Sequence, residues 1–250
     1  MDLGIAGRVA LVMGASKGIG RGIAEALARE GARVAIASRS RERVEQTAAE
    51  LEGELVGFEA DTADLERLAQ LPAEVESALG PVDILVTNTG GPPAGNALDA
   101  DLSEWREAYE HLVLAPRVLV ERVLPGMRER GWGRIVNVGS SSTREPIPGL
   151  ALSNSHRAGL VGFFKTLARE VAADGVTVND VATGRFATDR LAANWGGWDK
   201  MQEGAPKEVP AGRLGDPGEY GDLVAFLCSE RAAYITGTSI PIDGGMLRSV

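Results

Sequence analysis

The stretch Val9-Ala10-Leu11-Val12-Met13-Gly14-Ala15-Ser16-Lys17-Gly18-Ile19-Gly20 decides the fold. Its first five residues are apolar and end at a glycine, which is typical of a buried strand. Ile19, Ile23 and Leu27 then repeat at the spacing of one helix face. A strand, a glycine-rich turn and a helix in this order direct free backbone N–H groups and the positive helix end at a phosphate. A plain tight turn stays open as the alternative, because glycine-rich turns are common.

The composition restricts the classes of function. The chain has 250 residues, 44% of them hydrophobic and 24% charged, as expected for one large globular domain. Its net charge of −9 argues against a general role in binding nucleic acid or an anionic membrane. The single cysteine, Cys228, excludes an internal disulfide, and with only two histidines a metal site is not expected. The sequence predicts no secretion signal and no membrane span, so we expect a cytoplasmic protein.

Strand-like and helix-like segments alternate along the chain. After the first strand, strands are expected at 34–37, 55–58, 82–87, 134–138, 176–181 and 239–242. Helices are expected at 41–52, 64–79, 101–121, 155–172 and 216–229, with a kink or break at Pro72. The alternation predicts an α/β protein with a doubly wound parallel sheet of Rossmann type, helices on both faces, and a single dinucleotide-binding domain over 1–250.

One segment, 184–217, has no clear period. Long irregular segments often act as lids, so we predict a substrate lid at about 184–210, with Gly196-Gly197 as its hinge. Trp195 and Trp198 are expected to anchor the lid in the core rather than to contact substrate.

Polar and glycine-rich residues follow the predicted strands. In parallel α/β sheets ligands bind at the carboxyl ends of the strands. Those ends carry 14–20, Ser38-Arg39, Asp61-Thr62, Asn88-Thr89-Gly90, 140–142 and Thr183-Gly184. Because these groups would all lie at one edge of the sheet, they strengthen the phosphate interpretation of the first turn.

Five motifs, in the same order along the chain, resemble the short-chain dehydrogenase/reductase family, and most of all its 3-oxoacyl-carrier-protein reductases. They are 14–20, Asp61, 88–90, 133–140 and 236–245. The resemblance implies that the cofactor is bound by Gly14, Ser16, Lys17, Gly18, Ile19, Gly20, Ser38, Arg39, Asp61, Thr62, Asn88, Thr89, Gly90, Arg157, Gly184, Phe186 and Thr188.

The same resemblance locates the positions of the family's catalytic residues, and this sequence departs from the family pattern at three of them. The family uses an asparagine, a serine, a tyrosine and a lysine. The serine matches Ser140, but the Tyr-x-x-x-Lys pair falls on Ser153 and Arg157, and the asparagine falls on Leu112. The candidate catalytic residues are therefore Ser140, Ser153 and Arg157, with the cofactor half of the site retained and the proton-delivery half altered.

Each candidate has a role implied by the resemblance and an alternative. Ser140 would orient a carbonyl, or it merely ends a strand. Arg157 would bond a ribose hydroxyl, or it is a charge on the helix surface. Ser153 with Asn154 either holds a water that delivers the proton or serves as an N-cap of the following helix. His111 or His156 would be the substitute proton donor if neither serine takes part.

The cofactor and the assembly follow from two further features. No acidic residue follows the second strand, whereas Arg39 stands there with Lys17 nearby, so NADP(H) is predicted over NAD(H). Leu112, Val118, Phe163 and Phe164 add apolar surface to two helices, which together with the resemblance predicts a homotetramer.

Two functions remain open on the sequence. The first is an NADP(H)-dependent oxidoreductase that reduces a carbonyl or oxidises an alcohol with altered acid–base residues. The second is a non-catalytic dinucleotide-binding sensor or structural partner, which the replaced tyrosine, lysine and asparagine would fit.

Overall fold

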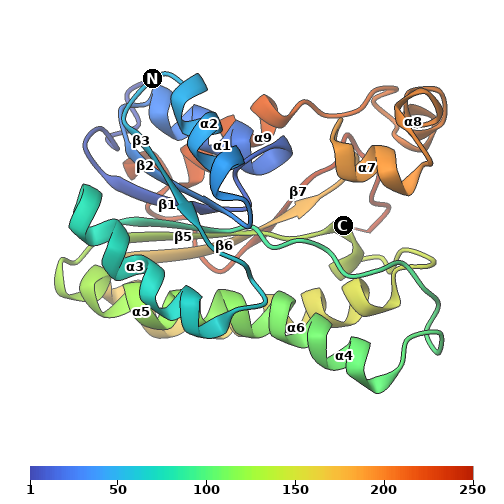
Figure 1. The fold of residues 1–250 in the computed structure, drawn as a ribbon, viewed down its shortest axis with the longest axis horizontal. Helices are drawn as coiled ribbons and strands as arrows, with labels where there is room; N and C mark the ends of the chain where they lie inside the picture. The colour runs from blue at the N-terminus through green and yellow to red at the C-terminus, as the bar shows by residue number, and fades with distance from the viewer. Residues whose placement is uncertain (250) are drawn as a thin grey trace.

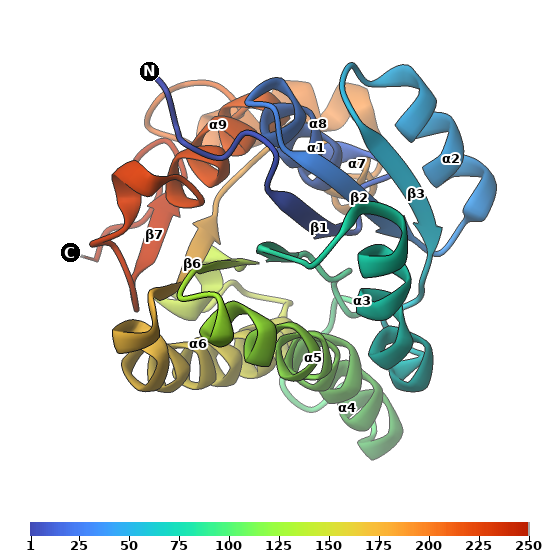
Figure 2. The ribbon, with the colours of Figure 1, turned by 90° about the vertical axis from the view of Figure 1, so that its left-hand side faces the viewer.

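The computed structural model describes residues 1–249 and contains one parallel sheet in the order β3-β2-β1-β4-β5-β6-β7. Figure 2 shows the sheet with β3 and β7 at opposite edges. The predicted fold class is confirmed, because every strand pair is parallel. The strands are β1 Val9–Met13, β2 Arg33–Ser38, β3 Leu55–Glu59, β4 Ile84–Thr87, β5 Gly133–Val138, β6 Val176–Thr183 and β7 Ser239–Ile242.

Helices cover both faces of this sheet. The helices are α1 Gly18–Arg29, α2 Arg41–Glu50, α3 Leu65–Leu79, α4 Leu102–Tyr109, α5 Ala115–Glu129, α6 Ala151–Val171, α7 Asp189–Asn194, α8 Trp198–Gly204 and α9 Pro217–Leu227. Helices α1, α2 and α9 lie on one face, α3, α5 and α6 on the other, and α7 and α8 lie beyond one end of the sheet (Figure 1). The central strands β1 and β4 are therefore buried on both sides, which explains their nearly continuous apolar sequences.

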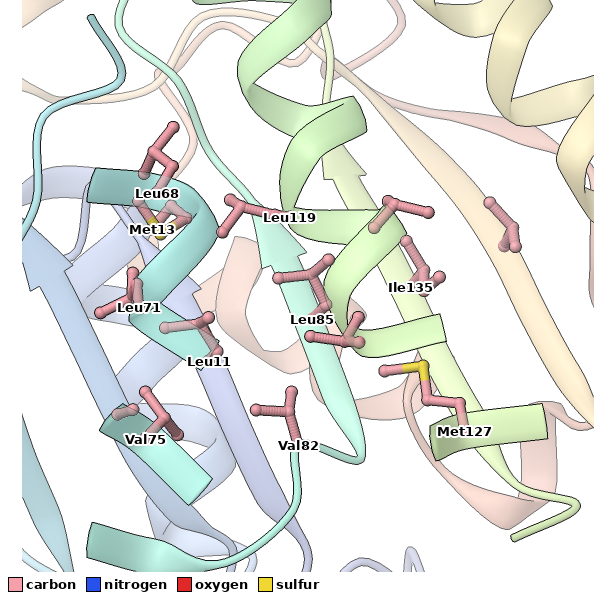
Figure 3. Packing of buried hydrophobic residues seen from close by; sticks show 14 of the residues in the cluster. Leu11, Met13, Leu68, Leu71, Val75, Val82, Leu85, Leu119, Met127 and Ile135 are labelled. Atoms are coloured by element: carbon pink, nitrogen blue, oxygen red, sulfur yellow. The ribbon is translucent and has the colours of Figure 1, made fainter. Parts of the chain in front are cut away.

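Each face of the sheet has its own hydrophobic core. In Figure 3, Leu71 and Leu119 pack with Leu11 and Leu85 in the core under α3 and α5. On the opposite face, Ile23 and Val224 pack with Val12 and Val86. The two cores hold the sheet between the helices and leave the carboxyl ends of the strands as its polar edge.

Three predictions about the helices are corrected. Helix α3 runs without a break through Pro72, whose buried neighbours Leu68, Leu71 and Val75 offset the missing hydrogen bond. The predicted helix at 101–121 is α4 followed by a π-helical turn, Glu110–Leu114, and α5, which extends to Glu129. Helix α6 begins at Ala151, four residues earlier than predicted.

The segment predicted as an irregular lid contains helices α7 and α8. Gly196 and Gly197 join them with φ angles of +75° and +128°, which favour glycine. Leu191 and Met201 form a small separate core with Trp195 against it, whereas Trp198 is 44% exposed. The sequence showed no period here because each helix has at most seven residues.

The apolar excess behind the predicted tetramer is mostly internal. Leu112, Leu160 and Phe164 are at most 2% exposed and belong to the fold itself. Leu102 and Tyr109 of α4, together with Leu98 just before that helix, are large apolar side chains that stay exposed. Leu112, Leu160 and Phe164 therefore belong to the core and do not by themselves indicate an interface, because apolar residues of a core and of an interface look alike in a sequence.

Helices α1 and α9 pack backbone to backbone through glycines. A Cβ on Gly22 would lie 2.3 Å from the carbonyl oxygen of Pro217, and a Cβ on Gly221 would lie 2.2 Å from that of Gly22. Neither distance is possible for real atoms, so the approach of α9 to α1 depends on these two glycines.

We predict that Gly221→Ala lowers the free energy of unfolding by about 2 kcal/mol or more, because the added methyl group forces the two helices apart. The matched control is Gly162→Ala in α6, where a Cβ would meet nothing within 4 Å. That variant should be stabilised by up to about 1 kcal/mol, since alanine is the better helix former. Urea denaturation of both variants checks the prediction, and equal stabilities would contradict it.

Candidate functional site

The glycine turn between β1 and α1 is fixed from the neighbouring strand. Gly14 and Gly18 have φ angles of +60° and +56°. A Cβ on Gly14 would lie 2.7 Å from the carbonyl oxygen of Asn88, and one on Gly20 would lie 2.2 Å from that of Gly14. Asn88 Nδ2 donates a hydrogen bond to Gly14 O at 3.2 Å. The loop after β4 therefore holds the turn in shape.

The N-terminus of α1 fits a phosphate group. Lys17 is its N-cap and makes no side-chain capping bond, so the first backbone N–H groups of the helix remain free to donate to a ligand. Thr188, the residue that caps α7, lies beside Gly18, 3.3 Å from the place of a Cβ there. The Lys17 ammonium, in contrast, forms an ion pair with Asp189 at 2.7 Å. Lys17 therefore ties α7 to the turn in this structure, and its role beside a ribose phosphate stays a prediction.

The next candidate residues lie at the ends of β2 and β3. Ser38 is buried and donates to Ser40 O, whereas Arg39 is exposed and makes no hydrogen bond or ion pair within residues 1–249. Asp61 accepts from the Ala63 N–H at 3.1 Å. Arg39 and Asp61 line a cavity of about 780 Å³ on the side of α3. A free cation at this place suits an anionic group on a nucleotide ribose.

Ser140 lies directly after β5 with its hydroxyl proton available. Its Oγ accepts a hydrogen bond from the Ser142 N–H at 3.1 Å. In the described part of the chain the hydroxyl has no acceptor of its own, and the residue is half-buried. The Ser140 hydroxyl can therefore donate to a ligand oxygen.

Ser153 and Asn154 lie in the first turn of α6, so the N-cap alternative is wrong. The N-cap is Leu150, which makes no side-chain capping bond. Asn154 holds the loop before the helix, since its Nδ2 donates to Ile147 O at 2.9 Å and its Oδ1 accepts from Ile147 N at 3.4 Å. Ser153 is half-buried and forms no hydrogen bond with residues 1–249.

Arg157 is buried where β4 and β5 end. Its guanidinium donates to Val138 O at 3.0 Å and to Gly90 O at 3.3 Å, and the residue is 8% exposed. The pKa of Arg157 is lowered to about 10, mainly by burial and next by the nearby Arg190 cation, while Asp180 opposes the shift. A guanidinium has five N–H groups, so donors remain for a ligand after both carbonyls are bonded.

Asp180 supplies a buried negative charge near Arg157. It lies in the middle of β6, accepts from Asn137 Nδ2 and from Ser239 Oγ, both at 2.6 Å, and is 2% exposed. Burial raises the pKa of Asp180, while these hydrogen bonds and the charges of Arg157 and Arg144 act against the rise. Sequence analysis did not single out Asp180, although a carboxylate inside an apolar strand was a visible signal.

Both histidines lie outside this cluster of contacts. His156 Nδ1 bonds to Leu152 O at 2.7 Å, and its ring packs against Trp105 and Tyr109 of α4, with centroids 5.1 and 6.1 Å away. His111 lies in the π-helical turn between α4 and α5. The geometry thus gives His156 a packing role and leaves the serines as the polar groups near Arg157.

The remaining predicted cofactor residues are Thr62, Thr89, Gly184 and Phe186. Thr62 and Thr89 are half-buried at the ends of β3 and β4. A Cβ on Gly184 would lie 2.5 Å from Asp243, so the chain passes β7 closely there. The Phe186 ring is buried against Tyr220 with centroids 5.2 Å apart, so a ligand can meet only its backbone.

Known proteins resemble this chain over nearly its whole length. A family model described as Enoyl-(Acyl carrier protein) reductase matches residues 14–247. The 3-oxoacyl-(acyl-carrier-protein) reductase of Vibrio cholerae is 38% identical over 244 residues, which cover 98% of this chain and 99% of that protein. Human dehydrogenase/reductase SDR family member 4 is 36% identical over 96% of this chain and 88% of that protein. The chain belongs to the short-chain dehydrogenase/reductase family.

Solved structures of the family have the same fold. L-sorbose reductase from Gluconobacter frateurii, complexed with NADPH and L-sorbose, matches with a TM-score of 0.94 and 33% identity, covering 100% of both chains. None of the helices formed by residues 1–249 is long and apolar enough to cross a membrane. Over the same residues, no group of three or more His, Cys, Asp or Glu side chains is placed to hold a metal ion.

We predict that Arg157→Met lowers the free energy of unfolding by about 2 kcal/mol or more near pH 7.5, because Asp180 loses its nearby cation and two carbonyls lose their donor. Without Arg157, the Asp180 pKa in the folded state should rise further above the unfolded value. The folded state then binds more protons than the unfolded state, so the loss should shrink as the pH falls to about 5.

The double variant Arg157→Met/Asp180→Asn tests this coupling. An asparagine can accept from Asn137 and donate to Ser239 without a buried charge, so the double variant should be more stable than Arg157→Met alone. Denaturant titrations of the parent, Arg157→Met, Asp180→Asn and the double variant at both pH values measure the coupling energy between the two residues. Purely additive losses, or a loss in Arg157→Met that does not depend on pH, would contradict the pairing.

Proposed function

We propose that this protein is an NADP(H)-dependent oxidoreductase that reduces a carbonyl or oxidises an alcohol. The observation that carries the proposal is the arrangement at one sheet edge of a phosphate-type glycine turn, the free Ser140 hydroxyl and the Arg157 guanidinium. The similarity to a reductase complexed with NADPH supports it. An assay of hydride transfer at 340 nm with a panel of ketones, beside a calorimetric titration of NADPH, tests it directly.

The cofactor would be held along the edge of the sheet. The N–H groups of Gly18, Ile19 and Gly20 would bind its diphosphate, and Arg39 would bind the ribose 2′-phosphate. Arg157 would donate its remaining N–H groups to the second ribose. When bound, NADP(H) supplies or accepts the hydride.

The substrate would meet residues that orient it without a strong acid. Ser140 would donate its hydroxyl proton to the carbonyl oxygen. Ser153 stands where the family resemblance implies a tyrosine, and a serine hydroxyl is far less acidic than a phenol. A water held by Ser153 would then deliver the proton, and we expect slow turnover of generic ketones, since general acid catalysis contributes roughly 10²–10⁴-fold.

A second candidate is a dinucleotide-binding protein without catalysis. The fixed position of Arg157, which bonds two backbone carbonyls, favours it, because such a residue stabilises the fold whether or not a reaction occurs. Binding of NADPH without turnover of any ketone would support this reading over the first.

We also propose that 184–210 moves as a lid over the substrate and that the protein forms a homotetramer. The lid has its own small core and joins the rest of the site through Asp189 and Arg190. The exposed Leu102 and Tyr109 on α4 border a hollow of about 270 Å³, which is an apolar surface suited to contact between copies.

The cofactor preference is tested by Arg39→Ala. We expect the variant to bind NADPH about tenfold more weakly and NADH unchanged, because a charge-assisted bond to the 2′-phosphate is lost. The control Arg29→Ala removes an equal charge at the far end of α1 and should bind NADPH as the parent does. Calorimetry that gives equal losses for both nucleotides would contradict the assignment.

The role of the serines is tested by turnover. Ser140→Ala should lower kcat about 10²-fold with little change in NADPH affinity, because it removes only the donor to the carbonyl. Ser153→Tyr/Arg157→Lys should raise kcat above that of the parent, and Ser153→Tyr alone should do less, since an unassisted phenol keeps a pKa near about 10. Turnover that Ser140→Ala leaves unchanged would place the chemistry elsewhere.

A further inference from the structure

Two arginines from different elements meet on the loop that follows β4. Arg157 of α6 donates to Gly90 O at 3.3 Å, and Arg190 of α7 donates to Gly91 O at 3.2 Å and to Pro92 O at 3.3 Å. The guanidinium groups therefore lie along three successive carbonyl oxygens. They are close enough for the charge of Arg190 to lower the pKa of Arg157.

The position of Arg190 depends on the absence of a side chain at Gly91. A Cβ on Gly91 would lie 2.2 Å from Arg190 Nη2 and 2.6 Å from Arg190 Cζ. The guanidinium thus lies flat against the backbone of Gly91. Its two hydrogen bonds to carbonyl oxygens leave other N–H groups of the guanidinium without a partner among residues 1–249.

The charges of the pair are not balanced by the chain. Neither guanidinium has a carboxylate within 4.0 Å among the described residues. Asp189, the sequence neighbour of Arg190, is committed to Lys17 at 2.7 Å. Asp180 acts on Arg157 from deeper in the protein, where it is bonded to Asn137 and Ser239. Two adjacent cations with one buried counter-charge leave a net positive charge beside the loop after β4, which an anion would neutralise.

We propose that Arg190, with Arg157 behind it, binds a carboxylate group of the substrate, so that the preferred substrates are small oxo acids or the matching hydroxy acids. This inference rests on the proposed function and specifies its substrate class. Arginine suits the task because its planar fork bonds both oxygens of a carboxylate. Ser140 would bond the oxygen of the reacting carbonyl while Arg190 holds the acid end.

The test measures binding rather than turnover. The protein is saturated with NADP⁺, which cannot reduce a ketone, and titrated calorimetrically with phenylglyoxylate and with its neutral methyl ester. We expect the acid to bind at least about tenfold more tightly than the ester. Arg190→Gln should abolish that preference, and Arg190→Lys, which keeps the charge but loses the fork, should retain part of it.

A matched control is Arg185→Gln. Arg185 lies in the same segment and is paired with Glu208 at 2.8 Å, so its loss changes the net charge equally without touching the pair. The ratio of acid to ester affinity should stay at the parent value in this variant. A ratio near one in the parent, or an unchanged ratio in Arg190→Gln, would overturn the inference.

The second source of an anion at this place is the diphosphate of the cofactor. If Arg190→Gln weakens NADP⁺ binding about tenfold and leaves the acid-to-ester ratio unchanged, the pair serves the cofactor and the substrate assignment is wrong. If the parent fails to bind NADP⁺, the proposed function is wrong, and the titration without nucleotide then tests the arginines alone. Acid-selective binding that Arg190→Gln abolishes would still support the carboxylate site.

Discussion

The close approach of α1 to its surroundings is the constraint on which the site depends. Gly14, Gly20 and Gly22 leave no room for a Cβ against Asn88, Gly14 and Pro217 respectively. Larger residues would push the helix away from the ends of β1 and β4 and out of contact with α9. The free N–H groups of α1 are useful only where the helix now starts, because a helix end acts on a ligand within its first turn. The glycines that allow the close backbone packing of α1 therefore also fix the place of the helix N-terminus where a ligand would bind.

The buried cation Arg157 is the second organising feature. A guanidinium in this position costs desolvation energy, and the chain offsets that cost with two carbonyl oxygens and with the buried charge of Asp180. A lysine has one compact head, which cannot bond Val138 O and Gly90 O with the same planar geometry. Arg157 thus joins the ends of β4 and β5 as well as facing the site, and Asp180 in β6 extends this polar layer across three strands.

Sequence reasoning reached the fold and most of the edge residues because both leave regular patterns. The alternation of strands and helices predicted the doubly wound sheet, and parallel strands bring the loops at Gly14, Asn88 and Ser140 to one edge. It did not reach Asp180 or Arg190. The charge balance around these two residues depends on which atoms lie next to them in the fold. No periodic pattern in the sequence shows those neighbours, either for a residue in a strand or for one in a short helix. The N-cap alternative for Asn154 failed for a related reason, since α6 starts without the usual capping side chain at Leu150.

In the segment 184–210, the same contacts fix the position of α7 and decide which charged groups are paired. Helix α7 has six residues, too few to be stable alone, so its place is set by its contacts. Asp189 bonds the glycine turn through Lys17, and the next residue, Arg190, bonds the loop after β4. These two bonds fasten α7 to the glycine turn and to the loop after β4, and Asp189 is thereby removed as a partner for Arg190. Arg190 consequently has no carboxylate within 4.0 Å among residues 1–249. If α7 moved away, the glycine turn and the loop after β4 would each lose a bonded partner, so the position of Arg190 depends on both contacts of the helix.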